Sequence, residues 1–182
     1  MDRLLRSLNG IAASLDQIGV KYALVGGLAV SAWGKARLTK DIDLKVNIDR
    51  QNLAAFQHSL LGQYRPLSEE ALAAAPAMGL LFLLDRDDVR IDLMLLDTSF
   101  DEKVLERAQP VELAPGEIYP VASPEDIIVY KLLSTRPHDL ADAASIVKRQ
   151  GKNLDRRYLR RWLEEFEAAL DDSSLVNTFL TL

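Results

Sequence analysis

Two aspartates lie two residues apart in a segment with strand-like alternation. Asp41 and Asp43 flank Ile42 within residues 39–46, where polar and apolar side chains alternate. Residues i and i+2 of a strand point to the same face, so we expect the two carboxylates to project side by side. Like charges on one face repel each other, and a divalent cation would offset that repulsion. A solvated edge strand with two surface acids is the alternative interpretation.

A glycine doublet precedes this pair. Gly26-Gly27 separates an apolar run at residues 22–25 from a helix that we predict over residues 28–33. Glycines at such a junction let the backbone approach a phosphate closely, and the N-terminus of the helix supplies N–H donors. A simple tight turn is the alternative, and it is the preferred interpretation of the doublet taken alone. No Gly-Lys-Ser/Thr sequence follows it, so this is not a P-loop.

A third acid follows in a later predicted strand. Asp92 lies between apolar residues in residues 89–96. If this strand neighbours the strand of Asp41 and Asp43, three carboxylates converge in one site. The alternative is that Asp92 is an ion-pair partner of Arg90 on a solvated face.

Together these segments resemble a known superfamily, the polymerase-β-type nucleotidyltransferases. The matching motifs are Val25-Gly26-Gly27, Arg37-Leu38-Thr39-Lys40-Asp41-Ile42-Asp43-Leu44 and Ile91-Asp92-Leu93. The subgroup that the sequence resembles most is the AbiEii-type abortive-infection enzymes, many of which are toxins. The resemblance implies an α/β nucleotidyltransferase fold, with a small mixed twisted sheet flanked by helices and a C-terminal helical region. One position departs from the pattern, because Gly27 stands where many members carry a phosphate-contacting serine.

The resemblance also implies a reaction. Asp41, Asp43 and Asp92 would be the catalytic residues and would bind two Mg²⁺ ions, with Asp92 able to take the proton of the acceptor. An NMP would pass from an NTP to an acceptor hydroxyl. The residues that would bind the nucleotide are Gly26, Gly27, Arg37, Thr39 and Lys131. The acceptor stays open between tRNA or another RNA, a small molecule and a protein. A toxin of this kind would have a cognate antitoxin as its partner.

Lys131 lies on an apolar helical stripe, three residues after Ile128. It either extends its amine to solvent or points into the cleft and neutralises triphosphate, and we favour the second interpretation. The charged residues that follow it either orient it or form pairs on the helix surface; they are Arg136, Asp139 and Asp142. Arg37 either meets phosphate or is a surface arginine.

Residues 148–161 reverse the acidic balance of the chain, with seven basic residues against the single acid Asp155. Such a segment could hold an RNA backbone. We favour a solvated helix, because Arg160 and Glu164 stand at i,i+4 spacing.

Two other functions use the same residues. A non-catalytic nucleotide-binding or antitoxin-like protein would keep the fold, although the presence of all three acids counts against it. A Mg²⁺-dependent phosphohydrolase would use the same carboxylates with water as the acceptor.

Composition narrows the remaining choices. The 182 residues include no cysteine and two histidines, which excludes thiolate chemistry and disfavours a histidine-rich metal site. The net charge of −5 argues against a surface coated in nucleic-acid contacts. The N-terminal residues lack the long apolar core of a signal peptide, and no apolar run is long enough for a bilayer. We therefore expect a cytoplasmic protein that does not enter membranes.

The pattern of residues predicts two parts, an α/β core over residues 1–122 and a helical subdomain over residues 123–182. In the core we expect helices at 2–18, 28–33, 50–61, 68–75 and 100–108, strands at 22–25 and 39–46, a hairpin at 79–96, and one or two strands within 111–121. Ser123-Pro124-Glu125-Asp126 is typical of a helix start. After it we expect helices near 124–134, 138–150, 155–170 and 173–180.

Overall fold

The computed structural model describes residues 2–134 and 136–182, and its centre is a mixed sheet. In the described chain the sheet has seven strands in the order β3-β4-β5-β2-β1-β7-β6. The strands are β1 (Tyr22–Leu24), β2 (Asp41–Val46), β3 (Arg65–Pro66), β4 (Leu80–Leu84), β5 (Arg90–Leu95), β6 (Gln109–Ala114) and β7 (Glu117–Val121). β2 pairs with β5 in parallel and with β1 antiparallel.

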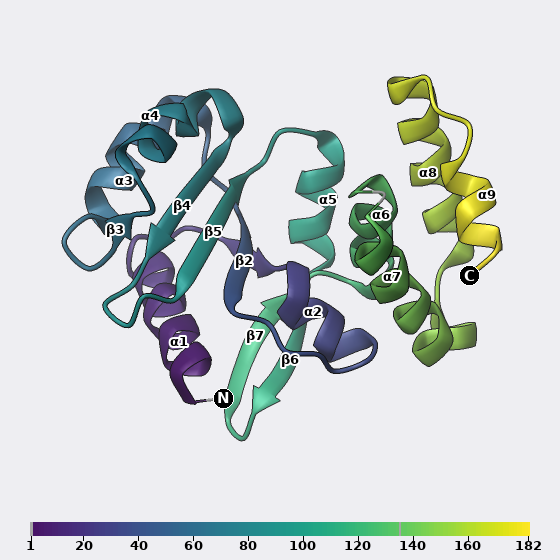
Figure 1. Cartoon of the computed structure of the whole chain (residues 1–182), viewed down its shortest axis with the longest axis horizontal. Helices are drawn as coiled ribbons and strands as arrows, with labels where there is room; N and C mark the ends of the chain where they lie inside the picture. Colours follow the sequence, from purple (N-terminus) through teal and green to yellow (C-terminus); the bar gives the residue numbers. More distant parts are fainter. Residues whose placement is uncertain (1, 135) are drawn as a thin grey trace.

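Helices surround this sheet, as Figure 1 shows. They are α1 (Asp2–Gln17), α2 (Gly26–Trp33), α3 (Leu53–Leu60), α4 (Glu69–Met78), α5 (Ser99–Arg107), α6 (Pro124–Ser134), α7 (Pro137–Gln150), α8 (Arg156–Leu170) and α9 (Leu175–Leu180), with short 3₁₀ turns at Arg50–Asn52 and Gly151–Asn153. None of the helices in these two described ranges is long and apolar enough to cross a membrane.

The two faces of the central strands differ in chemistry. Ile42, Leu44 and Val46 of β2 are completely buried, as are the alternate residues Ile91 and Leu93 of β5. Apolar residues at every second position must share a face, so this face joins the hydrophobic core. The residues between them are Asp41, Asp43 and Lys45 in β2 and Arg90, Asp92 and Met94 in β5. The opposite face of the same two strands therefore carries most of their charge.

Aromatic rings connect the sheet region to the C-terminal helices. Phe100 of α5 lies with its ring centroid 5.2 Å from that of Tyr130 in α6 and 4.9 Å from that of Trp162 in α8. Both pairs are edge-to-face, the arrangement that aromatic quadrupoles favour. One continuous hydrophobic cluster consequently includes residues from both parts of the chain.

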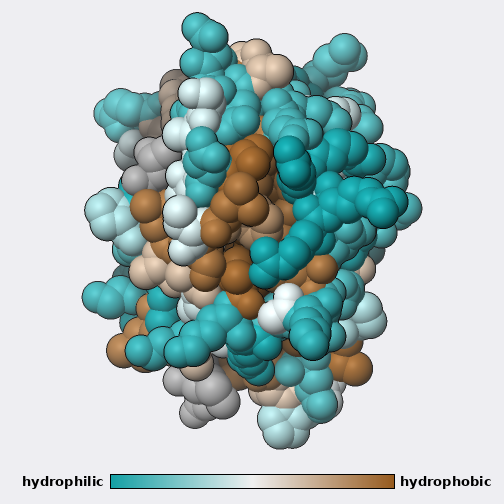
Figure 2. All heavy atoms as spheres, turned by 90° about the vertical axis from the view of Figure 1, so that its right-hand side faces the viewer, coloured by the Kyte–Doolittle hydropathy of each residue, from teal (hydrophilic) through white to brown (hydrophobic). Residues whose placement is uncertain are grey.

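The surface on the side of α8 and α9 is not uniformly polar. Figure 2 shows hydrophobic residues gathered near the middle of this side of the molecule, bordered by hydrophilic ones. Leu170 of α8 is 60% exposed and Leu180 of α9 is 67% exposed.

Both edges of the sheet are interrupted. β3 at one edge has two residues, of which the second is Pro66. β6 at the other edge contains Pro110, and its register with β7 shifts between Glu112 and Ala114. Proline removes a backbone donor, so Pro66 and Pro110 fit edge strands. Pro120, which is paired with Pro110, lies in β7, where only Val121 is paired with β1.

The predicted mixed α/β fold with helical C-terminal region is confirmed. Two boundaries near the glycine doublet and the aspartate pair differ from the prediction. α2 begins at Gly26, not after the doublet, and β2 begins at Asp41, so Thr39 lies in the preceding loop and not on the strand. Strand β3 was not predicted, because its two residues have no alternating pattern. The division at residue 122 stays a prediction, although α6 does begin at Pro124.

Candidate active site

The register of two neighbouring strands gathers charged side chains on one face of the sheet. Asp41 pairs with Arg90 and Asp43 pairs with Asp92 across the parallel β2–β5 ladder. Side chains of paired residues in neighbouring strands stand on the same face. The three predicted acids therefore belong to one surface, together with an arginine.

This surface forms one wall of a cavity of about 510 Å³. The rest of the cavity comes from the start of α2 and from α6 and α7. Its lining includes seven of the eight predicted site residues, namely Gly26, Gly27, Arg37, Asp41, Asp43, Asp92 and Lys131. The other lining residues are Val25, Arg90, Met94, Tyr130, Ser134, Arg136, His138 and Asp139.

Thr39, the eighth predicted residue, contacts the site from outside the cavity lining. Its hydroxyl donates a hydrogen bond of 2.6 Å to Oδ1 of Asp41. The loop before β2 thereby fixes the orientation of the first carboxylate. The predicted contact of Thr39 with nucleotide stays a prediction.

Asp43 has the most perturbed environment of the three acids. Burial, followed by the negative charges of Asp41 and Asp92, raises its pKa to about 6. The N–H of Gly27 and the positive charge of Lys131 lower the pKa by smaller amounts. A buried carboxylate among like charges is an arrangement that a bound cation would stabilise.

The glycine doublet allows the backbone of α2 to approach these side chains. A Cβ atom on Gly26 would lie 1.9 Å from Oδ2 of Asp43, and Gly26 has a φ of +59°. A Cβ atom on Gly27 would lie 2.6 Å from the hydroxyl oxygen of Thr39. Only glycine fits at either position while Asp43 and Thr39 keep their places.

Asp92 is held by an arginine from its own strand. Nε and Nη2 of Arg90 donate to the two carboxylate oxygens of Asp92 over 2.7 and 2.9 Å. Burial raises the pKa of Asp92, and the hydrogen bonds and charge of Arg90 oppose that shift. The pairing with Arg90 that the sequence offered as an alternative is thus present, but it lies inside the cavity and not on a solvated face.

Lys131 is buried and enters the cavity from α6. Its Nζ donates to Oδ1 of Asp139 and lies 3.2 Å from Oδ2 of Asp142. Nε of Arg37 lies 3.2 Å from the other oxygen of Asp142. The acids of α7 therefore orient both cations. The predicted contact of Lys131 and Arg37 with triphosphate stays a prediction.

Asp139 has the most hydrogen bonds among these acids. Burial raises its pKa, but hydrogen bonds from Lys131, Ser134 and Arg136, together with the charge of Lys131, bring the pKa down to about 2. Asp139 is completely inaccessible to solvent. It remains ionised at neutral pH and is the fixed anchor of Lys131.

A buried network that the sequence analysis missed lies at the end of the same charged face. Lys45 follows Asp41 and Asp43 on the strand face, and its Nζ lies 2.7 Å from Oδ1 of Asp101 in α5. The same oxygen accepts a hydrogen bond from the hydroxyl of Tyr130, whose side chain lines the cavity. The alternation Asp41-Asp43-Lys45 was the available signal for Lys45, whereas Asp101 and Tyr130 are distant in sequence.

The donors present suit a hard divalent cation. Asp41 and Asp43 offer oxygen ligands on one strand, and the cavity leaves room for water and substrate oxygens, which Mg²⁺ retains. Within residues 2–134 and 136–182, no group of three or more acidic or histidine side chains is already arranged as a ligand set. Both oxygens of the third acid, Asp92, accept hydrogen bonds from Arg90.

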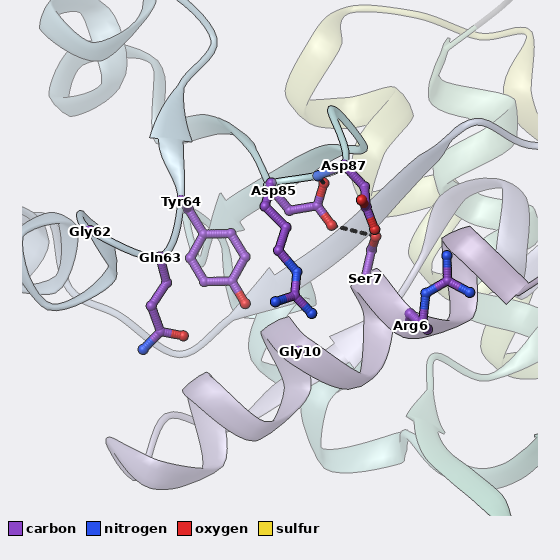
Figure 3. A pocket seen from close by; sticks show the side chains of 9 residues that line it. Arg6, Ser7, Gly10, Gly62, Gln63, Tyr64, Asp85 and Asp87 are labelled. Carbon is purple, nitrogen blue, oxygen red and sulfur yellow. Dashed lines mark hydrogen bonds between the residues drawn. The ribbon is translucent and has the colours of Figure 1, made fainter.

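A second cavity lies away from these residues. It has a volume of about 390 Å³ and lies between α1 and the turn that joins β4 to β5. Figure 3 shows Ser7 donating to Asp85 in this cavity. The other oxygen of Asp85 accepts from the backbone N–H groups of Asp87 and Val89. One oxygen of this carboxylate therefore stabilises the turn, and the other connects the turn to α1.

Known structures share this fold across most of their length. The solution structure of the antibiotic-resistance factor ANT(2'')-Ia has a TM-score of 0.65 at 16% identity, covering 94% of this chain and 97% of that chain. An antigenic nucleotidyltransferase-like protein from Paracoccidioides brasiliensis has a TM-score of 0.54 at 20% identity, covering 98% and 92%. The lincomycin-bound lincosamide antibiotic adenylyltransferase LnuA has a TM-score of 0.53 at 16% identity, covering 78% and 96%. No curated protein matches the sequence.

The fold is that of the polymerase-β-type nucleotidyltransferase superfamily. Residues 4–177 match the family described as "Nucleotidyl transferase of unknown function (DUF2204)", and the chain belongs to that family. It is a nucleotidyltransferase, an enzyme that transfers a nucleoside monophosphate.

Proposed function

We propose that this enzyme transfers an NMP from an NTP to the hydroxyl of an acceptor, in a reaction that requires Mg²⁺. The observation that carries the proposal is the single cavity that Asp41, Asp43 and Asp92 share with the glycine doublet and Lys131. Negative side chains on one wall and a positive side chain opposite are what a metal-bound triphosphate requires.

The cations of the cavity hold the triphosphate. Lys131 and Arg37 both form ion pairs with carboxylates of α7, so their positive charges are positioned before the substrate binds. Such preorganised charges stabilise the negative charge that develops on the leaving pyrophosphate. The start of α2 adds backbone N–H groups close to the same wall.

The acids of β2 and β5 bind the metal and activate the attacking hydroxyl of the acceptor. Asp41 and Asp43 would hold Mg²⁺, which supplies charge neutralisation and polarises the phosphate when it is bound. The acceptor oxygen forms a bond to the α-phosphorus, and the bond from that phosphorus to the pyrophosphate oxygen breaks with its electron pair. The hydroxyl proton passes to Asp92, whose oxygens retain lone pairs beside Arg90.

Incubation with each α-³²P-labelled NTP, Mg²⁺ and cell lysate tests this function. We expect label on an acceptor together with free pyrophosphate, and loss of both in Asp41→Asn and Asp92→Asn. Free labelled nucleotide without a labelled acceptor would identify a phosphohydrolase. An absence of NTP binding in calorimetry would identify a non-catalytic protein of the same fold.

The acceptor and the biological role are separate proposals. Two bases within residues 148–161 already have partners within the chain: Arg149 donates to the carbonyl of Gly34, and Arg160 pairs with Glu164 over 2.7 Å. These contacts support a solvated helix more than an RNA-binding surface. The AbiEii-type resemblance supports a toxin with a cognate antitoxin, which predicts that induced expression arrests growth and that Asp41→Asn relieves the arrest.

A further inference from the structure

The third acid of the candidate active site already has a cation that belongs to the chain. Arg90 donates from two nitrogens to the two oxygens of Asp92, over 2.7 and 2.9 Å. A guanidinium that engages both oxygens of a carboxylate forms one of the stronger hydrogen-bonded contacts in proteins. Asp92 is only 8% exposed, so solvent competes little with this contact. The carboxylate of Asp92 therefore has a positive partner before any metal ion binds.

Arg90 is fixed in this position by more than its ion pair. It stands two residues before Asp92 in β5, so both side chains lie on the same face of the strand. The guanidinium carbon lies 4.8 Å from the ring centroid of Phe82, the residue that pairs with Asp92 across the β4–β5 ladder. On the other side of β5, Asp41 is the residue paired with Arg90. The positive charge of Arg90 is thus held on the wall of the cavity that carries the three acids.

The charges of this wall match one divalent cation. Asp41, Asp43 and Asp92 contribute three negative charges when they are ionised, and Arg90 contributes one positive charge. Two negative charges remain, which is the charge that a single Mg²⁺ ion neutralises. A second divalent ion at Asp92 would meet the like charge of the guanidinium. The charge balance of this wall consequently favours one metal ion over two.

The arrangement of the acids agrees with this balance. Asp41 and Asp43 stand on one strand, and their side chains share a face. Among the residues that the structure describes, no three acidic or histidine side chains form a group that could hold a metal ion. Mg²⁺ at nucleotide sites commonly uses one or two carboxylates and takes its other ligands from water and from phosphate oxygens. Asp41 and Asp43 are therefore sufficient, and Asp92 is not required as a ligand.

We propose that this enzyme uses a single Mg²⁺ ion, held by Asp41 and Asp43, and that Arg90 replaces the second ion that the family resemblance implies. The guanidinium occupies the carboxylate that would otherwise bind that ion and supplies a positive charge in its place. Asp92 then receives the proton of the acceptor without binding metal. Arg90 acts through Asp92 and is a positioning residue. This inference rests on the proposed nucleotide transfer and names the metal requirement of its site.

Counting bound Mn²⁺ by electron paramagnetic resonance tests the proposal, because Mn²⁺ accepts the same oxygen ligands as Mg²⁺. The full chain is titrated with Mn²⁺ in the presence of an α,β-methylene NTP, whose bridging carbon prevents the release of pyrophosphate. The analogues of all four NTPs are used in turn. We expect one bound Mn²⁺ per wild-type chain. Arg90→Gln frees the oxygens of Asp92, and this variant should bind two.

Arg37→Gln is the matched control for this experiment. It removes the same charge from the same cavity, but Arg37 pairs with Asp142 and not with Asp92. The control variant should keep one Mn²⁺ per chain. Two ions in wild type, one ion in Arg90→Gln, or two ions in Arg37→Gln would each overturn the proposal.

Substitution of single acids gives a second measurement that does not depend on the folding of an Arg90 variant. Asp92→Asn should leave the Kd of Mn²⁺ within about threefold of wild type, whereas Asp41→Asn should raise it about tenfold or more. Equal weakening in the two variants would identify Asp92 as a metal ligand and refute the replacement by Arg90.

The outcomes also separate this inference from the proposed transfer. A wild-type chain that binds two Mn²⁺ ions and still labels an acceptor would refute only the single-metal site. A wild-type chain that binds neither Mn²⁺ nor any of the four analogues would refute the nucleotide transfer itself.

Discussion

Asp43 illustrates how a residue of the candidate active site opposes folding. Its pKa of about 6 in the folded chain lies above the ordinary value of 3.8. The folded state consequently holds its proton more tightly than the unfolded state does. Stability therefore falls as pH rises from about 4 to about 6, and the full loss is present at neutral pH.

Asp43→Asn should stabilise the metal-free protein while it abolishes transfer. We expect the free energy of unfolding to rise by about 2 kcal/mol at pH 7 and to be nearly unchanged at pH 4, where the wild-type carboxyl is protonated. Urea titrations at the two pH values measure this. Asp49→Asn, at an exposed position, should change stability by less than about 0.5 kcal/mol. If Asp43→Asn destabilised the protein at pH 7, this would contradict the raised pKa of Asp43.

The two glycine environments in the N-terminal region permit a matched comparison. Gly26→Ala should destabilise the chain by about 2 kcal/mol or more, because the new Cβ collides with Asp43 and φ is positive. Gly10→Ala in α1 meets only the Tyr64 hydroxyl at 3.5 Å and should stabilise by about 0.5–1 kcal/mol. Thermal melts of both variants provide the measurement, and similar shifts in Tm would refute the steric explanation.

At the residue level the sequence predicts much of the candidate site. Asp41, Asp43 and Asp92 are recognisable because acids interrupt apolar strands, and Lys131 because a cation interrupts an apolar helical stripe. The ion pairs could not be predicted in the same way. Whether Asp139 and Asp142 contact Lys131 depends on how α7 packs against α6, and local sequence patterns carry no information on that packing.

Among the elements, α6 and α7 are connected by the buried ion pairs of Lys131 with Asp139 and Asp142. The pKa of Asp139 is about 2, below its ordinary value of 3.8. A depressed pKa means that the pair stabilises the fold above about pH 4 and that this contribution disappears as pH falls through about 2.

Asp139→Asn should therefore lower the free energy of unfolding by about 2–4 kcal/mol at pH 7, because it also leaves Lys131 buried without its main partner. The difference in the free energy of unfolding between this variant and wild type should become smaller as the pH falls from 4 to 2. Glu164→Gln removes the exposed pair with Arg160 and should leave the stability nearly unchanged. Urea denaturation followed by circular dichroism at several pH values compares the two variants with wild type. If the difference in the free energy of unfolding between Asp139→Asn and wild type did not depend on pH, the ionisation of Asp139 could not be its cause.

Element positions were predicted better than element pairing. Periodicity and capping residues indicate α1, α6 and the β4–β5 hairpin. The parallel pairing of β2 with β5, which brings Asp43 beside Asp92, joins segments separated by two helices and two strands. Local periodicity carries no information on such a contact. The convergence of the acids could therefore be predicted only on the condition that the two strands are neighbours.

For the molecule as a whole, the continuous hydrophobic cluster implies cooperative unfolding. Trp33 of α2 donates to the carbonyl of Ala122 over 2.7 Å, and Trp162 lies in α8 beside Phe100. The two tryptophans report on opposite sides of the predicted division at residue 122. We expect both sides to lose structure together.

Single-tryptophan variants test this. Trp162→Phe leaves Trp33 as the fluorescent reporter, and Trp33→Phe leaves Trp162. Each variant should show the same urea midpoint by fluorescence and by circular dichroism. A fluorescence transition of Trp162 that precedes the loss of overall secondary structure would show that the C-terminal helices unfold as a separate unit.

The interrupted edges of the sheet have a consequence for self-association. An exposed edge strand is a template on which another chain can add a strand, and long regular edges promote aggregation. Here one edge ends in two residues with Pro66, and the other combines Pro110 with an irregular register. Intermolecular β-sheet extension is therefore disfavoured at both edges of the sheet.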